Sequence, residues 1–465
     1  MKILNKSIDK YSDFPAYFFC FLFAIAGVTV SLNRFWQYEV FYYDFGIYDQ
    51  AIWNVSRFSA PIIDNFVVGG KWIFADHFNP SIFLLSPLYW LTSRSEIILI
   101  AQSIIVAMSG LVLYDIGKKI LNSRFLSLSV LTSYLLFLGL QNAMISDFHE
   151  VTISVFPLML TFWSLIKKMK LSYFIFLIVT LGFKESSLGL GIGIGILIFF
   201  IQKEWLKIGF LTIVISLLWG FLAIHIVIPY FSGGIYQYLP EHLGIFSVLG
   251  GFFDSPTKQR TIFYSFLSFG FLPLLSPGFW ALIIQDFFIR FIPNWPSRWD
   301  LGLHYSAQLA CVLAISSLYG VKQLKKYPFA SRHLHVIGIL IIFNAIYLYR
   351  FVLHGPLALS YNTAFYNNTK NFLFLDKLID KIPLKATVMA QNNLAVRFTH
   401  QKVWILRNDY KRYNPDYIII DARGGQSSNN YFGFNELNSF VAKVKNDSNY
   451  LLSYHTQEQY IFKRN

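Results

Sequence analysis

Five short polar segments that could do chemistry stand at or near the ends of long apolar runs in this 465-residue chain. They are residues 43–49, 76–80, 146–150, 183–186 and 303–306. Ionisable side chains at membrane depth are costly, so they usually face a cavity or a partner. A carboxylate there could act as a general base, and a cation or an imidazole could bind a phosphate. The side chains concerned are Asp44, Asp49, His77, Asp147, His149, Glu150, Lys184, Glu185, His304 and Tyr305.

The two aspartates of the first segment have two interpretations. Tyr48, Ile52 and Trp53 recur at helical spacing, which predicts an amphipathic helix over residues 47–57 at the membrane surface. Asp44 stands next to its N-terminus, where a carboxylate is favoured by the helix dipole. Asp44 then either caps this helix, or serves as a general base at the boundary between water and lipid.

The other polar segments also leave two interpretations open. Taken singly, each ionisable group could belong to a structural pair. Lys184 and Glu185, however, have little polar sequence around them. Taken together, the segments place Asp, His, Lys and Glu on one side of the membrane, and this asymmetry favours a polar site on the outer side.

A divalent metal fits some of these residues. Asp44, His149 and Glu150 offer oxygen and nitrogen ligands that suit Mg²⁺ or Mn²⁺. No tight ligand spacing demands a metal, so the sequence leaves metal dependence open.

The composition defines the elements that must position these groups. Hydrophobic residues make up 55% of the chain and charged residues 14%, against about 25% charged in soluble domains. These values exclude a soluble globular enzyme and a disordered protein, and they predict an α-helical polytopic membrane protein. The net charge of +14 is explained by lysine-rich cytoplasmic loops, so no nucleic-acid partner is needed.

The apolar runs and the charged loops between them predict about eleven transmembrane helices. Lys2, Lys6 and Lys10 place the N-terminus in the cytoplasm, and an outer loop of residues 33–95 follows the first helix. Residues 78–92 carry two prolines and are too short to cross, so we expect an interfacial or re-entrant segment. The runs are 14–32, 96–116, 124–143, 151–166, 171–183, 186–202, 206–230, 261–275, 278–292, 303–321 and 334–353, with breaks expected between 261 and 292.

The chain divides by composition into a membrane domain, 1–354, and a polar domain, 355–465. In the polar domain, helical stretches at 369–381 and 435–446 alternate with strand-like runs, which predicts a small α/β domain outside the cytoplasm. It has no GxGxxG or P-loop motif, so a nucleotide site has no support. The expected strands are 386–390, 402–406, 417–421, 449–455 and 459–463.

The ordered motifs resemble a family of uncharacterised multi-pass membrane proteins of prokaryotes. The resemblance rests on Asp44–Gln50, His77–Pro80, Asp147–Glu150, Lys184-Glu185 and His304–Ser306, and covers nearly the whole chain. That family is in turn similar to the C-type (GT-C) membrane glycosyltransferases, which use polyprenyl-phosphate sugars and have a catalytic aspartate early in the first outer loop. Asp44 matches that position, but Phe45 replaces the usual second acidic residue, and His77 lies where a lysine is usual.

The resemblance implies a glycosyltransferase at the outer face of the cell membrane. Its partners would be a lipid-linked sugar donor, membrane lipids and an acceptor of unknown identity. Asp44, with Asp49 nearby, would supply the catalytic carboxylates. Lys184, His149 and either Arg290 or Arg298 would bind the phosphate, while Asp49, Glu150, Glu185 and His304 would hold the acceptor or orient the cations. A transporter or lipid flippase, and a non-catalytic component of envelope-polymer assembly, remain as alternatives.

Overall fold

The computed structural model describes residues 13–64, 70–238, 250–293, 295–431, 434 and 436–465. Lys2, Lys6 and Lys10, which carry the prediction of a cytoplasmic N-terminus, lie outside the described residues. The chain is mostly helical, at 69%. It divides into two compact units: unit 1 comprises Met1–Thr29, Asp76–Ser81 and Ala101–Ser360, and unit 2 comprises Val30–Ala75, Ile82–Ile100 and Tyr361–Asn465.

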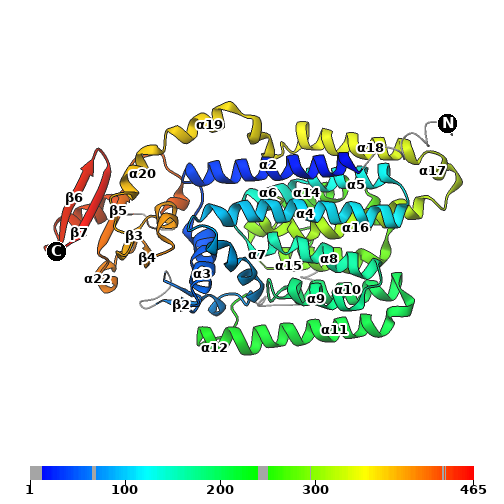
Figure 1. Cartoon of the computed structure of the whole chain (residues 1–465), viewed down its shortest axis with the longest axis horizontal. Coiled ribbons are helices and arrows are strands. Elements are labelled where there is room, and N and C mark those ends of the chain that lie inside the picture. Colours follow the sequence, from blue (N-terminus) through cyan, green and yellow to red (C-terminus); the bar gives the residue numbers. More distant parts are fainter. Residues whose placement is uncertain (1–12, 65–69, 239–249, 294, 432–433, 435) are drawn as a thin grey trace. The chain divides into compact units, whose positions relative to one another are not determined.

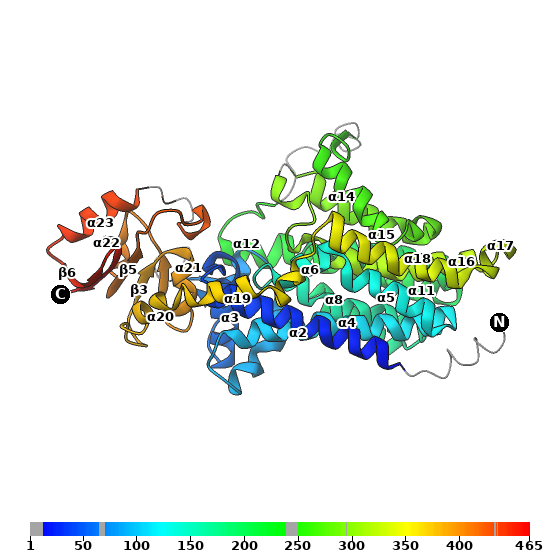
Figure 2. The ribbon, with the colours of Figure 1, turned by 90° about the horizontal axis from the view of Figure 1, so that it is seen from above.

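Unit 1 is a bundle of apolar helices. The helices α4, α16 and α18 run in nearly the same direction in both views of the ribbon (Figures 1 and 2). The helices α2 and α4 have residues in both units. The bounds are α2 Phe14–Trp36, α4 Glu96–Leu121, α5 Arg124–Leu136, α6 Leu138–Ile145, α7 Glu150–Ile153, α8 Val155–Ile166, α9 Lys170–Leu181, α10 Ser187–Ile201, α11 Leu206–Phe221, α12 Ile228–Ser232, α14 Pro256–Leu267, α15 Trp280–Phe291, α16 Ala307–Leu324, α17 Pro328–Arg332 and α18 Leu334–Tyr347.

Each of the eleven predicted apolar runs contains a helix. Within the described residues, five helices are long and apolar enough to cross a membrane, or six if the bent pair α5 and α6 forms one span. Three further apolar helices are shorter, at 150–166, 170–181 and 187–201. Their length, composition and number agree with a membrane protein that crosses the bilayer several times.

The two segments that were expected to depart from regular helices do so. Pro80–Trp90 forms a 3₁₀ helix, η3, with Pro87 inside it, in place of a spanning α-helix. After α14, Phe271 takes a left-handed conformation with φ of 55°, and two short turns, η6 (Leu272–Leu275) and η7 (Pro277–Phe279), precede α15. Proline lacks an amide proton, which explains why continuous α-helix fails at these places.

The lysine-rich loops of unit 1 meet at one end of its helices. Lys118 Nζ lies 2.9 Å from Asp13, and Lys167 Nζ lies 3.0 Å from Asp115. Lys325 at the end of α16 donates to the carbonyl of Leu121 at the end of α4. Loops that are far apart in sequence therefore share one cationic end, as the alternation of charged loops predicts.

Unit 2 combines the first loop with the C-terminal part of the chain. Gln37 Nε2 donates to the carbonyl of Phe365 at 2.7 Å, and the Tyr38 hydroxyl donates to Asp376 at 2.6 Å. The first loop contains η1 (Tyr42–Gly46), α3 Ile47–Ser56, β1 Ile62–Ile63 and β2 Lys71–Trp72, so the predicted helix at 47–57 is confirmed. The C-terminal helices are α19 Thr363–Lys370, α20 Leu373–Ile379, α21 Asn392–Ala395, α22 Tyr410–Tyr413 and α23 Leu437–Lys445.

A five-stranded mixed sheet forms the core of the C-terminal part. Its order is β4-β3-β5-β7-β6. The strands β4, β3 and β5 are parallel to one another, and β7 pairs antiparallel with both β5 and β6. Every predicted strand is confirmed, with bounds β3 Val388–Ala390, β4 Val403–Ile405, β5 Tyr417–Asp421, β6 Tyr450–Thr456 and β7 Gln459–Arg464.

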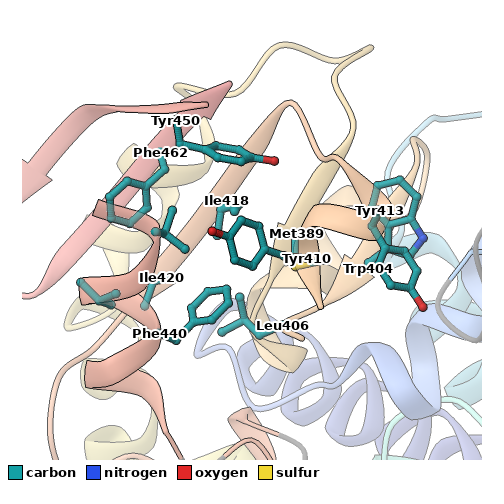
Figure 3. Close-up of a cluster of buried hydrophobic side chains, with 12 residues drawn as sticks. Met389, Trp404, Leu406, Tyr410, Tyr413, Ile418, Ile420, Phe440, Tyr450 and Phe462 are labelled. Carbon is teal, nitrogen blue, oxygen red and sulfur yellow. The ribbon is translucent and has the colours of Figure 1, made fainter. Parts of the chain in front are cut away.

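The hydrophobic core of this sheet lies under α22 and α23 (Figure 3). Ile418 and Ile420 point to the same face of β5 because side chains alternate along a strand, and Phe440 of α23 covers them. The Tyr410 ring packs edge-on against Phe440 with centroids 5.4 Å apart. This layered packing gives the loops at the carboxyl ends of the parallel strands a rigid base.

Candidate functional site

A cavity of about 410 Å³ in unit 1 brings together most of the predicted binding residues. Its wall combines cations, carboxylates and phenols with apolar side chains such as Leu188, Ile224 and Ile289. Such a mixture suits a ligand with a charged head and an apolar body. The polar lining residues are His77, Lys184, Glu185, Ser186, Tyr236, Tyr238, Gln285, Asp286, Arg290, Arg298, Tyr305 and Gln308.

The turn between α9 and α10 presents Lys184 and Glu185 to the cavity. The preceding Gly182 accepts a hydrogen bond from the Ser81 amide at 2.9 Å, and a side chain at Gly182 would meet Ser81 Oγ at 2.2 Å. Ser81 Oγ also donates to the carbonyl of Val179 at 2.9 Å. These contacts fix segment 76–81 against the turn, which explains how His77 reaches Glu185 from a distant part of the sequence.

Glu185 is fully buried and accepts hydrogen bonds from three groups. They are His77 Nδ1 at 2.9 Å, the Tyr236 hydroxyl at 2.8 Å and the Phe78 amide at 3.2 Å. Burial raises the pKa of Glu185, but His77 and Lys184 lower it by more. For His77, burial and Lys184 lower the pKa, whereas Glu185 and Asp76 raise it further, so the net shift is upward. The pair therefore favours an imidazolium beside a carboxylate.

Lys184 forms a second buried ion pair. Its Nζ lies 2.7 Å from Glu150 at the start of α7, and the Glu150 side chain is only 1% exposed. Burial lowers the pKa of Lys184, but Glu150 and Glu185 outweigh burial and raise it. Lys184 is thus a fixed cation that lines the cavity, and Glu150, which does not line it, compensates the charge of Lys184.

The two arginines of the cavity wall have different surroundings. Arg290 is buried, and its guanidinium donates to the carbonyls of Arg298 and Asp300 at 2.9 and 2.6 Å and to Asp286 at 3.4 Å. The Arg298 guanidinium instead lies 3.9 Å from the centre of the Trp295 ring. Among the described residues, Arg298 has no carboxylate partner. Its charge is therefore the one best available to an anionic ligand.

Three further predicted residues, His149, His304 and Asp147, are not part of the cavity wall. The rings of His149 and His304 stack with centroids 3.5 Å apart, next to Glu150 and Tyr305 in sequence. His304 Nδ1 is buried, and no residue in the described part of the chain forms a hydrogen bond with it. Asp147 takes a left-handed conformation with φ of 52°, and its carbonyl accepts from Gln102 at 2.6 Å. Of the predicted binding residues, Asp147, His149, Glu150 and His304 do not line the cavity, although Glu150 contacts the lining residue Lys184.

The predicted catalytic aspartates belong to unit 2. Asp44 lies partly exposed in the first turn of the helical run formed by η1 and α3. Asp49, one turn later, is fully buried. The Asp49 carboxylate accepts from Tyr89 and Thr399, from Ser95 Oγ at 2.7 Å, and pairs with His400 Nε2 at 3.3 Å. Asp49 therefore fixes the surrounding chain, whereas Asp44 is partly exposed.

Charge and donors around Asp49 keep it ionised. Burial raises its pKa, but His400 and the hydrogen bonds from Thr399 and Tyr89 lower it by more. The His400 ring stacks on Trp53 with centroids 3.9 Å apart and planes 7° apart. The stack holds the imidazole in the orientation that the carboxylate needs.

Sequence reasoning missed several of these residues. Tyr236, Tyr238 and Gln308 line the cavity, and Thr399 and His400 hold Asp49. The tyrosines had a signal, because they follow Gly233-Gly234 directly after an apolar run. Thr399 and His400 had none, because nothing in the sequence indicates that they meet a residue 350 positions earlier.

The suggested metal ligands do not form one group within a unit. His149 and Glu150 belong to unit 1, whereas Asp44 belongs to unit 2. Over the part of the chain that the structure describes, no cluster of three or more His, Cys, Asp or Glu residues could hold a metal ion. The ligand set Asp44, His149 and Glu150 stays a prediction.

One comparison with known proteins gives a match. A family whose description reads "Predicted membrane protein (DUF2079)" matches residues 34–460. No curated protein matches the chain. The match covers both units and all five polar segments, so the expected resemblance to an uncharacterised family of membrane proteins is confirmed.

Proposed function

The chain belongs to the DUF2079 family of predicted membrane proteins, and we propose that it transfers a sugar from a polyprenyl-phosphate donor at the outer face of the membrane. The observation that carries this proposal is the unit 1 cavity. Its volume of about 410 Å³ suits a sugar phosphate, and its apolar side chains suit the start of a lipid tail. Arg298, without a carboxylate partner among the described residues, would bind the phosphate.

The charge distribution of unit 1 supports an outer location for this cavity. Segments 76–81, 146–150, 183–186 and 298–306 contact one another at the ends of helices whose other ends carry the lysine-rich loops. The positive-inside rule places the lysine-rich end in the cytoplasm. The passes α2, α4, α5–α6, α7–α8, α9, α10, α11–α12, α14, α15, α16 and α18 would then make eleven crossings and leave the C-terminal part outside.

The proposed reaction assigns a task to each group. Asp44 would take the proton from an acceptor hydroxyl, whose oxygen then attacks the anomeric carbon of the sugar. The bond between that carbon and the phosphate oxygen breaks, and polyprenyl phosphate leaves with the electron pair. Lys184 and Arg298 would stabilise the negative charge of the departing phosphate. The role of Asp44 rests on its resemblance to the catalytic aspartate of C-type glycosyltransferases.

The remaining polar groups would support Asp44, Lys184 and Arg298. Glu185 would orient His77 and Tyr236, as its hydrogen bonds indicate. Arg290 would shape the wall of the cavity, because two of its nitrogens donate to backbone carbonyls and the third donates to Asp286. Glu150 would balance the charge of Lys184.

The test is a transfer assay on the purified protein with a panel of polyprenyl-phosphate sugars. We expect Arg298→Gln to weaken donor binding about 10- to 100-fold, because a charge-assisted contact to phosphate is lost. We expect Asp44→Asn to lower the rate by at least about 100-fold with little change in donor binding. Arg260→Gln, an exposed arginine of α14 outside the cavity wall, and Glu39→Gln, an exposed carboxylate near Asp44, are the matched controls.

The outcomes separate this proposal from its rivals. Absence of transfer with every donor in the wild type would contradict the enzyme. Donor binding that depends on Arg298 without any transfer would indicate a lipid transporter or flippase. Activity that Asp44→Asn leaves unchanged would remove Asp44 as the base.

A further inference from the structure

The N-terminus of the helical run that carries Asp44 is held by a residue from a distant part of the chain. η1 and α3 form one continuous run from Tyr42 to Ser56, so the first amide protons of the run lack intrahelical acceptors. The residue at the N-cap position, Phe41, makes no side-chain capping bond. The Tyr43 amide is one of these donors, and its hydrogen bond leads to a distant part of the sequence.

That acceptor comes from the C-terminal part of unit 2. Asn392 Oδ1 accepts the hydrogen bond of the Tyr43 amide at 3.0 Å, across 349 positions of sequence. Its own amide group donates to the carbonyl of Asn429 at 2.9 Å, and Asn392 is only 2% exposed. Asn392 begins α21 two residues after the end of the parallel strand β3, so its backbone position is set by the sheet.

A second set of contacts holds the same run about one turn later. Thr399 and His400 bind Asp49, and Gln50 Nε2 donates to the carbonyl of Gln401 at 3.2 Å. These residues lie between β3 and β4, as Asn392 does. One connection of the sheet, residues 391–401, therefore contacts the run on both sides of Asp44 in sequence.

We propose that residues 391–401 position Asp44, with Asn392 and His400 as positioning residues. This inference rests on the proposed function of Asp44. The C-terminal part is then a component of the catalytic apparatus, because it fixes the first turn on which the base stands. A base displaced by about 1 Å loses much of its effect, so the positioning contacts should affect turnover and leave donor binding in the cavity unchanged.

Hydrogen exchange of the whole protein tests the contact itself. In Asn392→Leu the Tyr43 amide loses its acceptor, so we expect its exchange to become about tenfold faster. Asn392→Asp keeps the acceptor oxygen and should keep most of the protection. The matched control is Asn362→Leu, which removes an asparagine cap from α19 in the same unit and should leave Tyr43 unchanged.

The transfer assay tests the consequence. We expect Asn392→Leu and His400→Gln to lower kcat about tenfold or more, with KM for the donor unchanged, and Asn392→Asp to restore most of kcat. Unchanged exchange at Tyr43 in Asn392→Leu, or a loss in KM alone, would overturn the positioning role. A wild type without activity would contradict the proposed function instead, while the exchange result would still show whether Asn392 holds the run.

Discussion

Two buried carboxylates, Glu185 in unit 1 and Asp49 in unit 2, are held by similar donors but have different surroundings. Each is fully buried, and each receives a histidine and a tyrosine hydroxyl. Glu185 borders a cavity of about 410 Å³. Asp49 is surrounded by the donors Tyr89, Ser95, Thr399 and His400, which join two distant parts of the chain.

The difference shows how the same chemistry can serve binding or positioning. In unit 1, Glu185 pairs with His77 and Glu150 pairs with Lys184, and both cationic side chains line the cavity. Their positive charge is therefore available to a ligand. In unit 2, the donors surround the Asp49 carboxylate, whose hydrogen bonds connect the first loop with the C-terminal part of the chain. Burial of an ionisable group is therefore not by itself a sign of a binding site, and the neighbouring cavity decides.

The largest effect on stability should come from breaking the buried ion pair between Lys184 and Glu150. In Lys184→Met, the buried Glu150 carboxylate loses its ion pair with Lys184, so we expect the free energy of unfolding to fall by about 3–5 kcal/mol. The variant Lys184→Met with Glu150→Gln removes both charges and should recover most of that loss. Unfolding in detergent by heat or denaturant measures both.

The matched control is an exposed pair of the same type at the cationic end. Lys168 and Glu204 have side chains that are 59% and 55% exposed, so Lys168→Met should change stability by less than about 0.5 kcal/mol. Equal stability of Lys184→Met and the wild type would show that Glu150 is compensated elsewhere. The cavity would then differ less from the closed Asp49 cluster than the geometry indicates.

The sequence predicted the elements of both regions better than their association. The apolar runs and the strand-like runs became helices and strands, because periodicity and composition are local properties. Of the ten predicted binding residues, six line one cavity: His77, Lys184, Glu185, Arg290, Arg298 and Tyr305. Asn392, Thr399 and His400 were missed, because their importance depends on contacts with a loop more than 300 positions away.

A smaller effect should come from the Asp49 cluster. His400→Gln removes one of four donors to a buried carboxylate, so we expect a loss of about 1–2 kcal/mol in the free energy of unfolding. His455→Gln, at an exposed position of β6, is the matched control and should stay within about 0.5 kcal/mol. Because the cluster does not line the cavity, polyprenyl phosphate should stabilise His400→Gln and wild type by the same amount. Unequal stabilisation would break the distinction between the two regions.

The smallest effect, about 1 kcal/mol, should be a difference in pH dependence between the regions. The folded protein raises the pKa of His77 above its ordinary 6.5, so the stability that His77 contributes is complete below pH 6.5 and is lost as pH rises through the folded pKa. Asp49 has the opposite sign. Its pKa is lowered from 3.8, so its contribution is complete above that value and is lost as pH falls through the folded pKa.

Unfolding of His77→Gln and Asp49→Asn from pH 3 to pH 9 measures the two contributions as differences from the wild type. The deficit of His77→Gln should shrink on the alkaline side, and that of Asp49→Asn on the acid side. Glu185, whose pKa is lowered from 4.5, limits the His77 contribution at low pH, because the pair needs the carboxylate. Between about pH 4.5 and 6.5 both deficits should be complete. Parallel profiles for the two variants would contradict the opposite pKa shifts of His77 and Asp49 on which the comparison of the two regions rests.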